Sequence, residues 1–174
     1  MLSGIFFYPV RSAWLDVRTY LFVLLFAAGN LVLPQLCHLT PSGGRIFLPI
    51  YFFTLIASYK FGWKVGLMTA LLSPVLNFVF FGMPMAAVLP SILIKSALLS
   101  LIASHVAQSY KRLSLFHLLL VVLGYQIIGS VIEWALTQSF TTAIGDLTIG
   151  LTGMIIQIFG GWWLLKQLAR YGRR

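Results

Sequence analysis

The sequence predicts an all-α membrane protein, a six-transmembrane-helix bundle with both termini cytoplasmic. Hydrophobic residues make up 60% of the 174 residues and charged residues only 9%. Water-soluble domains carry roughly 25% charged residues. Long apolar runs alternate with short polar connections, and 12 Lys and Arg residues stand against 3 Asp and Glu residues. Because each span needs about 20 residues, the length suits one integral membrane domain, residues 1–174.

The apolar runs, interrupted by charges or by Gly and Pro clusters, predict the spans in chain order. Residues 1–17 are expected to lie at the membrane surface as a retained segment, with Trp14 among the lipid headgroups. Connections are expected at residues 37–45 and 139–146, and Pro74 is expected to kink the third span. The six expected helices, within about residues 19–169, are Thr19–Leu36, Ile46–Phe61, Lys64–Gly82, Ala86–Gln108, Ser114–Gln138 and Leu147–Ala169.

The cations predict the orientation of the bundle. Assigning connections alternately to two sides leaves Arg45 as the one loop cation on the outer side. By the positive-inside rule, both termini are cytoplasmic. We expect the chain to lie in the inner (plasma) membrane of a prokaryotic cell. Nucleic-acid binding is not expected, because it needs cations gathered on one accessible face. The cations of the inner side are Arg11, Arg18, Lys60, Lys64, Lys111, Arg112, Lys166, Arg170, Arg173 and Arg174.

Polar residues inside the expected spans predict a site in the outer half of the membrane. Lys95 and Glu133 lie within the fourth and fifth spans, where an ionisable side chain costs about 2.5–3.5 kcal/mol, so both should face the bundle interior. In one interpretation they form a structural ion pair while the amides join helices. In the other they line an outward-facing polar pocket. The candidate substrate-binding residues are Asn30, His38, Arg45, Tyr51, Asn77, Lys95, Gln126, Glu133 and Trp134.

Small residues at helical spacing form a stripe on the fourth span. Such stripes let helices approach closely, so this one packs either against a neighbouring helix of this chain or against a partner protein. The candidate partner-binding residues are Ser96, Ser100, Ala103, Ser104 and Ala107.

The sequence does not predict an enzyme. It contains no GxSxG, HExxH, CxxC or G-x-x-x-x-G-K-[ST] motif. Its acidic residues, Asp16, Glu133 and Asp146, are too dispersed for the carboxylate clusters of most metal-dependent enzymes, and Cys37 is the single cysteine. We therefore expect no catalytic residues, no metal site and no cofactor.

A family resemblance rests on several segments of the sequence, on the six expected spans and on the polar outer loop between the first two of those spans. The segments are LPIYFFT (48–54), KFGWKVG (60–66), LSPVLN (72–77), FGMP (81–84) and LPSILIKS (89–96). With these features nearly the whole chain resembles the substrate-binding S components of energy-coupling factor (ECF) vitamin transporters. One departure concerns the first helix. Many S components carry an Ala-x-x-x-Ala pair there for docking, but here Ala27 and Ala28 are followed four residues on by Leu31 and Val32.

The resemblance implies a binding subunit for ATP-driven uptake of a vitamin or similar small nutrient. It also implies a transmembrane T subunit and two ATPase subunits as partners, which agrees with the lack of a phosphate-binding loop. In such a site Lys95 would meet an anion or carbonyl, Glu133 a cation or N–H donor, and Tyr51 and Trp134 would stack on the ligand. The alternative is a non-catalytic membrane scaffold resembling the rod-shape protein MreD, which needs no ligand pocket.

Overall fold

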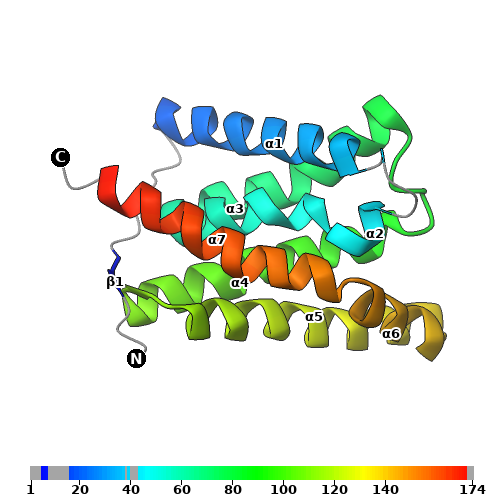
Figure 1. Ribbon diagram of the computed structural model, residues 1–174. Helices are drawn as coiled ribbons and strands as arrows, with labels where there is room; N and C mark the ends of the chain where they lie inside the picture. The colour runs from blue at the N-terminus through cyan, green and yellow to red at the C-terminus, as the bar shows by residue number, and fades with distance from the viewer. Residues whose placement is uncertain (1–4, 8–15, 38, 40–42, 172–174) are drawn as a thin grey trace.

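The chain folds into a bundle of α-helices with a short strand pair at one end (Figure 1). The computed structural model describes residues 5–7, 16–37, 39 and 43–171. The predicted all-α class is confirmed, since the strands are two residues long. In chain order the elements are β1 (Ile5–Phe6), α1 (Val17–Cys37), α2 (Gly43–Phe47), the 3-10 helix η1 (Pro49–Tyr51), α3 (Phe52–Phe81), α4 (Leu89–Tyr110), β2 (Arg112–Leu113), α5 (Leu115–Thr137), α6 (Phe140–Ile149) and α7 (Leu151–Tyr171).

Several of these helices are long and apolar enough to cross a membrane, which makes the chain a multi-pass membrane protein. The described chain has up to 5 such spans if one bent helix pair is counted as a single broken span. That pair is Ala143–Ile149 and Leu151–Arg170, whose axes differ by 57°. The 4 that qualify individually are Val17–Cys37, Pro49–Phe81, Leu89–Tyr110 and Leu115–Thr137.

α3 reverses direction at Gly62, so that it forms two antiparallel arms. Gly62 has φ 82° and ψ 180°, a backbone region open essentially to glycine. A methyl group added to Gly66 would stand 2.7 Å from the Cα of Ser58, although eight residues of a straight helix span about 12 Å. The chain therefore turns back between the second and third spans predicted from the sequence. Away from Gly62, the helical dihedrals of α3 continue through Pro74, where a kink was expected.

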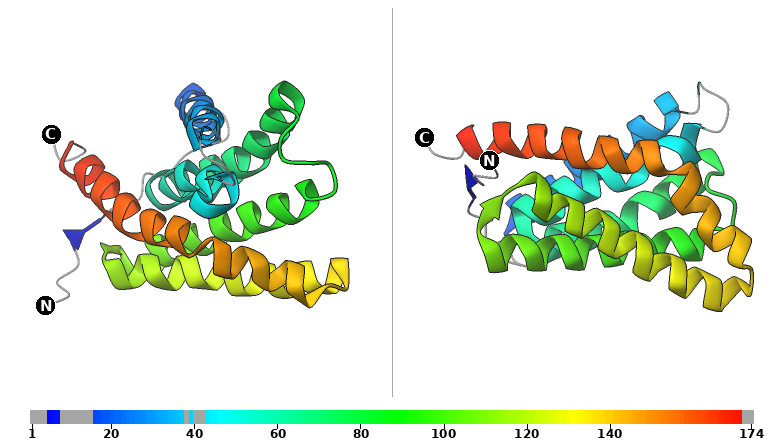
Figure 2. Two further views of the ribbon diagram at one scale, coloured as in Figure 1. Left: turned by 45° about the vertical axis from the view of Figure 1, so that its right-hand side comes forward. Right: turned by 60° about the horizontal axis from the view of Figure 1, so that its bottom comes forward.

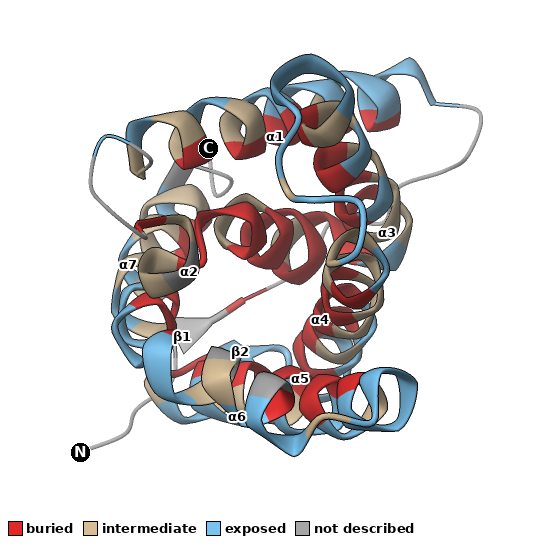
Figure 3. Ribbon diagram, turned by 90° about the vertical axis from the view of Figure 1, so that its right-hand side faces the viewer, coloured by how far each residue is buried: buried red, intermediate tan, exposed pale blue. Residues whose placement is uncertain are grey.

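The first arm of α3 forms the centre of the bundle. Leu55, Ile56, Ala57 and Tyr59 are all 0% exposed. α3 packs against both α1 and α4, while α5 packs against α4, α6 and α7. Figure 2 shows α1 and α5 on opposite sides of the bundle with α3 between them, and Figure 3 shows the buried residues lining the inner faces of the helices.

The end of the bundle that holds the α3 turn also carries the predicted inner-side cations of the described chain. β1 pairs with β2 in antiparallel register, and Phe7 is 1% exposed beneath the Lys60 ammonium, which lies 4.7 Å from its ring centroid. The Tyr59 hydroxyl donates to the Arg112 carbonyl at 2.8 Å. The N-terminal segment, expected at the membrane surface, thus contributes a buried ring; Trp14 lies outside the described residues.

The segment 139–146, expected as a connection, instead lies mostly in α6. Its Thr and Ser content suggested a loop, because such hydroxyls compete for backbone groups. Thr141 and Thr142 of this segment lie within α6, and the helix continues to Thr148, whose hydroxyl donates back to the carbonyls of Ile144 and Gly145 at 3.2 and 3.1 Å. The expected last span therefore begins as a bent helix pair.

Candidate functional site

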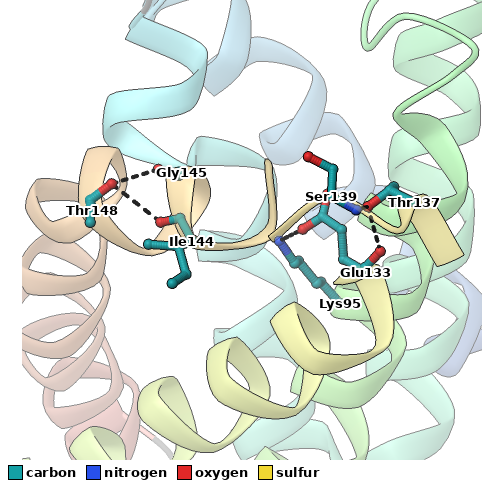
Figure 4. A network of polar contacts seen from close by, with 7 residues as sticks. All are labelled: Lys95, Glu133, Thr137, Ser139, Ile144, Gly145 and Thr148. Atoms are coloured by element: carbon teal, nitrogen blue, oxygen red, sulfur yellow. Dashed lines mark hydrogen bonds and ion pairs between the residues drawn. The ribbon is translucent and has the colours of Figure 1, made fainter. Parts of the chain in front are cut away.

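Lys95 and Glu133 form a buried ion pair between α4 and α5. The Nζ of Lys95 lies 2.6 Å from Oε2 of Glu133, and the two residues are 1% and 3% exposed. Figure 4 shows the pair beside Thr137, whose hydroxyl donates to the Glu133 carbonyl at 2.8 Å. The pair lies about 9 Å along α4 from Leu89, in the half of the bundle remote from the cation-rich end. The structure thus places both charges in the bundle interior, as their insertion cost predicted.

The inner face of α5 continues the polar surface below Glu133. Gln126, Gly129, Ser130 and Glu133 share this face by their spacing, and each of the three polar residues is at most 7% exposed. The carboxamide nitrogen and oxygen of Gln126 form no hydrogen bond with the described chain, and the hydroxyl of Ser130 forms none either. A buried polar group without a partner costs about 1–3 kcal/mol of folding free energy. This face therefore destabilises the fold unless a bound molecule forms the missing hydrogen bonds.

Two tyrosines and a glutamine extend the polar surface to η1 and α7. The rings of Tyr51 and Tyr125 lie 5.4 Å apart, and the Tyr125 hydroxyl donates to Oε1 of Gln157 at 3.0 Å. All three residues are at most 3% exposed. Because its oxygen is occupied, Gln157 offers only its Nε2, which has no partner among the described residues.

The two predicted asparagines belong to a different contact, between α1 and α3. Nδ2 of Asn30 donates to the hydroxyls of Thr54 and Ser73 at 2.9 and 3.1 Å, which joins α1 to both arms of α3. Its Oδ1 accepts from the Phe53 N–H at 3.2 Å. Nδ2 of Asn77 donates to the Asn30 carbonyl at 2.9 Å. These bonds correspond to the helix-joining interpretation of the amides.

The remaining predicted binding residues lie apart from the polar surface or outside the described atoms. Trp134 is 48% exposed, and its ring meets Phe140 edge-on at 5.7 Å between centroids. The structure therefore directs it to the outside of the bundle and not beside Glu133. His38 lies outside the described residues, and Arg45 lies on α2 with its side chain outside them.

The small-residue stripe of α4 is an internal helix contact. Ser96, Ser100, Ala103 and Ala107 are 0% exposed, and Ser104 is 2% exposed. The Ser104 hydroxyl donates to the Ser58 carbonyl at 3.2 Å, and the Ser100 hydroxyl lies where a methyl group on Gly66 would clash. The stripe packs against α3, which is the first of the two interpretations.

An apolar cavity of about 280 Å³ opens between α1, α2, η1, the start of α3 and α7. None of the predicted binding residues whose side chains the structure describes lines it. The cavity shares no lining residue with the polar surface of α5, and its walls are mainly apolar. Its walls are Leu33, Leu36, Cys37, Phe47, Pro49, Phe52 and Ile156.

Ser130 and Gln157 belong to the polar surface but are not among the binding residues that the sequence predicts. The Ser130 signal was present, because Gln126, Ser130 and Glu133 repeat at helical spacing within one apolar span. The Gln157 contact with Tyr125 joins helices 32 residues apart in the chain and carries no local signature. In the described part of the chain, no group of three or more His, Cys, Asp or Glu side chains could hold a metal ion.

Comparison with known proteins identifies no relative. No family model, no curated protein and no solved structure matches the chain. Any functional conclusion therefore depends on the geometry of this molecule.

Proposed function

We propose that the chain is the membrane-embedded substrate-binding subunit of an ATP-driven uptake system for a vitamin or similar small nutrient. The observation that carries this proposal is the polar inner face of α5. It presents a buried ion pair and a carboxamide whose two polar atoms have no partner in the described chain. A bundle selected for stability alone would replace such groups with apolar side chains, whereas binding sites keep a few polar groups in apolar surroundings.

The proposed topology has six spans with both termini cytoplasmic in a prokaryotic plasma membrane. The reversal at Gly62 supports counting the two arms of α3 as separate passes. The clustering of Lys60 and Arg112 at one end supports the orientation, since cations favour the cytoplasmic side. Lys95 and Glu133 then lie in the outer half, where a nutrient arrives.

The proposed system follows the organisation of ECF transporters, whose S components the sequence resembles. The chain would capture the nutrient, while a T subunit and two ATPase subunits supply the energy. The chain itself would carry out no chemistry. Because α3 covers the stripe on α4, the T subunit would dock on another surface of the chain.

The alternative, a non-catalytic membrane scaffold, is favoured by one observation. Lys95 and Glu133 contact each other at 2.6 Å and therefore satisfy each other without a ligand. Replacing a buried ion pair by apolar residues of similar volume is often neutral for stability or favourable. A scaffold should then keep its activity in the double variant Lys95→Met/Glu133→Leu.

Mass spectrometry of the purified protein tests the proposal. Wild type, extracted gently from cells grown in rich medium, should release a small polar compound that Lys95→Met/Glu133→Leu does not release. Trp134→Leu, altered on the outer side of α5, is the matched control and should retain the compound. Uptake of that compound by cells should require the chain. Wild type that releases no compound under these conditions and supports no vitamin uptake would overturn the proposal.

A further inference from the structure

The charge and hydrogen-bonding groups of the buried polar surface define the ligand more narrowly than a small nutrient. The surface consists of Lys95, Gln126, Ser130, Glu133 and Gln157. This inference rests on the proposed function, since it concerns the same site.

The ion pair leaves this surface with no net charge among its described residues. Lys95 and Glu133 lie 2.6 Å apart, and both are almost fully buried. A charged ligand would either have to open the pair, which strands a buried charge, or enter without a counter-charge. Both routes are unfavourable in a low-dielectric interior. A neutral ligand encounters neither cost.

The position of Lys95 is fixed from the opposite helix. Gly129 lies one turn before Glu133, and a methyl group there would stand 2.6 Å from Cγ of Lys95. The aliphatic stem of Lys95 therefore crosses the backbone of α5 in the space that glycine leaves. This close contact holds the ammonium against Glu133, which makes opening of the pair still less favourable.

Gln126 supplies the specific recognition element. Its carboxamide is 1% exposed and has an N–H donor and a carbonyl acceptor, side by side in one plane, that form no hydrogen bond with the described residues. Such a group is complementary to a neighbouring N–H and C=O on the ligand, with which it forms two parallel hydrogen bonds. Proteins use the same bidentate geometry when Asn or Gln binds an adenine edge.

The groups around Gln126 add donors and an aromatic wall. The Ser130 hydroxyl, one turn along the same face, has no partner in the described structure, and neither has Nε2 of Gln157. Tyr125 holds Gln157 through Oε1, which leaves only the donor end free. The adjacent rings of Tyr51 and Tyr125 suit a planar, unsaturated compound.

We infer that the ligand is a neutral, planar heterocycle that presents a lactam edge, a ring N–H next to a ring C=O, to the carboxamide of Gln126. This statement excludes the anionic, cationic and zwitterionic nutrients, which Lys95 and Glu133 could each have bound as well as neutral carbonyl or N–H groups. The five described polar residues, and not the exposed Trp134, would carry the recognition.

Equilibrium binding to the purified protein in nanodiscs tests the inference with three groups of probes. The first contains neutral lactam rings, lumazine and 2-pyridone derivatives among them. The second contains the same rings methylated at the lactam nitrogen, and the third contains charged vitamins such as thiamine and nicotinate. We expect binding from the first group, with affinity on the order of 10- to 100-fold weaker after methylation.

The variant Gln126→Leu separates recognition from folding. It removes a buried polar group that has no partner among the described residues, so its thermal stability should equal or exceed that of wild type, while lactam affinity falls on the order of 10- to 100-fold. Gln108→Leu, on the exposed face near the cation-rich end of α4, is the matched control and should bind as wild type does.

The outcomes distinguish this inference from the function on which it rests. A charged vitamin that binds while the lactams do not would overturn the inference and support the uptake function. Equal affinity for methylated and unmethylated rings, or unchanged affinity in a folded Gln126→Leu, would also overturn it. The absence of binding by every probe in all three groups would overturn the inference and contradict the proposed function together.

Discussion

The aliphatic stem of Lys95 packs directly against Gly129, on the helix that carries its ion-pair partner. A methyl group at Gly129 would stand 2.6 Å from Cγ of Lys95, closer than side chains tolerate. The geometry of the ion pair therefore depends on Gly129 as well as on Lys95 and Glu133. The glycine is as specific a requirement as the charges.

Gly129→Ala should destabilise the protein by about 1–3 kcal/mol, because overpacking forces Lys95 away from Glu133. Gly124→Ala lies on the same helix, but its methyl group would meet Ile102 at an ordinary 3.7 Å. Alanine favours a helix over glycine by up to about 1 kcal/mol, so this control should be neutral or stabilising. Thermal unfolding of both variants in the same detergent measures the difference. Equal stability would contradict the packing described for Lys95.

The ion pair itself should show strong coupling. Lys95→Met or Glu133→Leu alone strands a buried charge and should cost about 3–5 kcal/mol, while the double variant should recover most of that loss. A double-mutant cycle on unfolding free energies measures the coupling. Additive losses would mean that the two side chains do not interact in the membrane.

The turn within α3 should depend on glycine at one position. Gly62→Ala places a side chain at φ 82° and ψ 180° and should cost about 1–3 kcal/mol or more. Gly82 is a matched control, since its φ of 66° lies in the ordinary left-handed region and nothing lies within 4 Å of an added methyl group. Gly82→Asn should therefore unfold at nearly the wild-type temperature. A Gly62→Ala protein as stable as Gly82→Asn would argue against the reversal at Gly62.

Asn30 should contribute more to stability than Asn77. Asn30→Leu removes side-chain bonds to Thr54, Ser73 and the Phe53 N–H, so we expect a loss of about 1–3 kcal/mol. Asn77→Leu removes a single bond to α1 and should cost about 0.6 kcal/mol, a typical value for interhelical bonds in membranes. Denaturant unfolding ranks the two variants, and the reverse order would contradict the network.

The sequence predicted depth within the membrane better than it predicted direction around a helix. The insertion cost of a charge was enough to place Lys95 and Glu133 in the interior. Trp134 is the next residue after Glu133, yet one residue turns a helix by about 100°, and its ring lies on the outside. Polarity at a given depth could not separate the two positions, because an interfacial tryptophan and a stacking tryptophan have the same hydropathy.

Long-range pairing explains most of what sequence reasoning missed. The turn at Gly62 was predictable, because Lys60 and Lys64 mark the end of two apolar runs. The assignment of Asn30 to both arms of α3, and of Gln157 to Tyr125, depends on which helices become neighbours. A single sequence does not indicate which helices pack against each other. α6 was missed for a local reason, since the hydroxyl residues of segment 139–146 are typical of a loop, although Thr141 and Thr142 lie within the helix.

Nutrient capture requires that the polar face of α5 be reached from outside the cell, and cysteine labelling tests this access most directly. In a Cys37→Ser background, Ser130→Cys should react in intact cells with a small membrane-impermeant methanethiosulfonate, and ligand should slow the reaction. Ser104→Cys, packed against α3, is the control and should stay unreactive. A Ser130→Cys protein as inert as the Ser104→Cys protein would show a closed interior and contradict nutrient capture at this site.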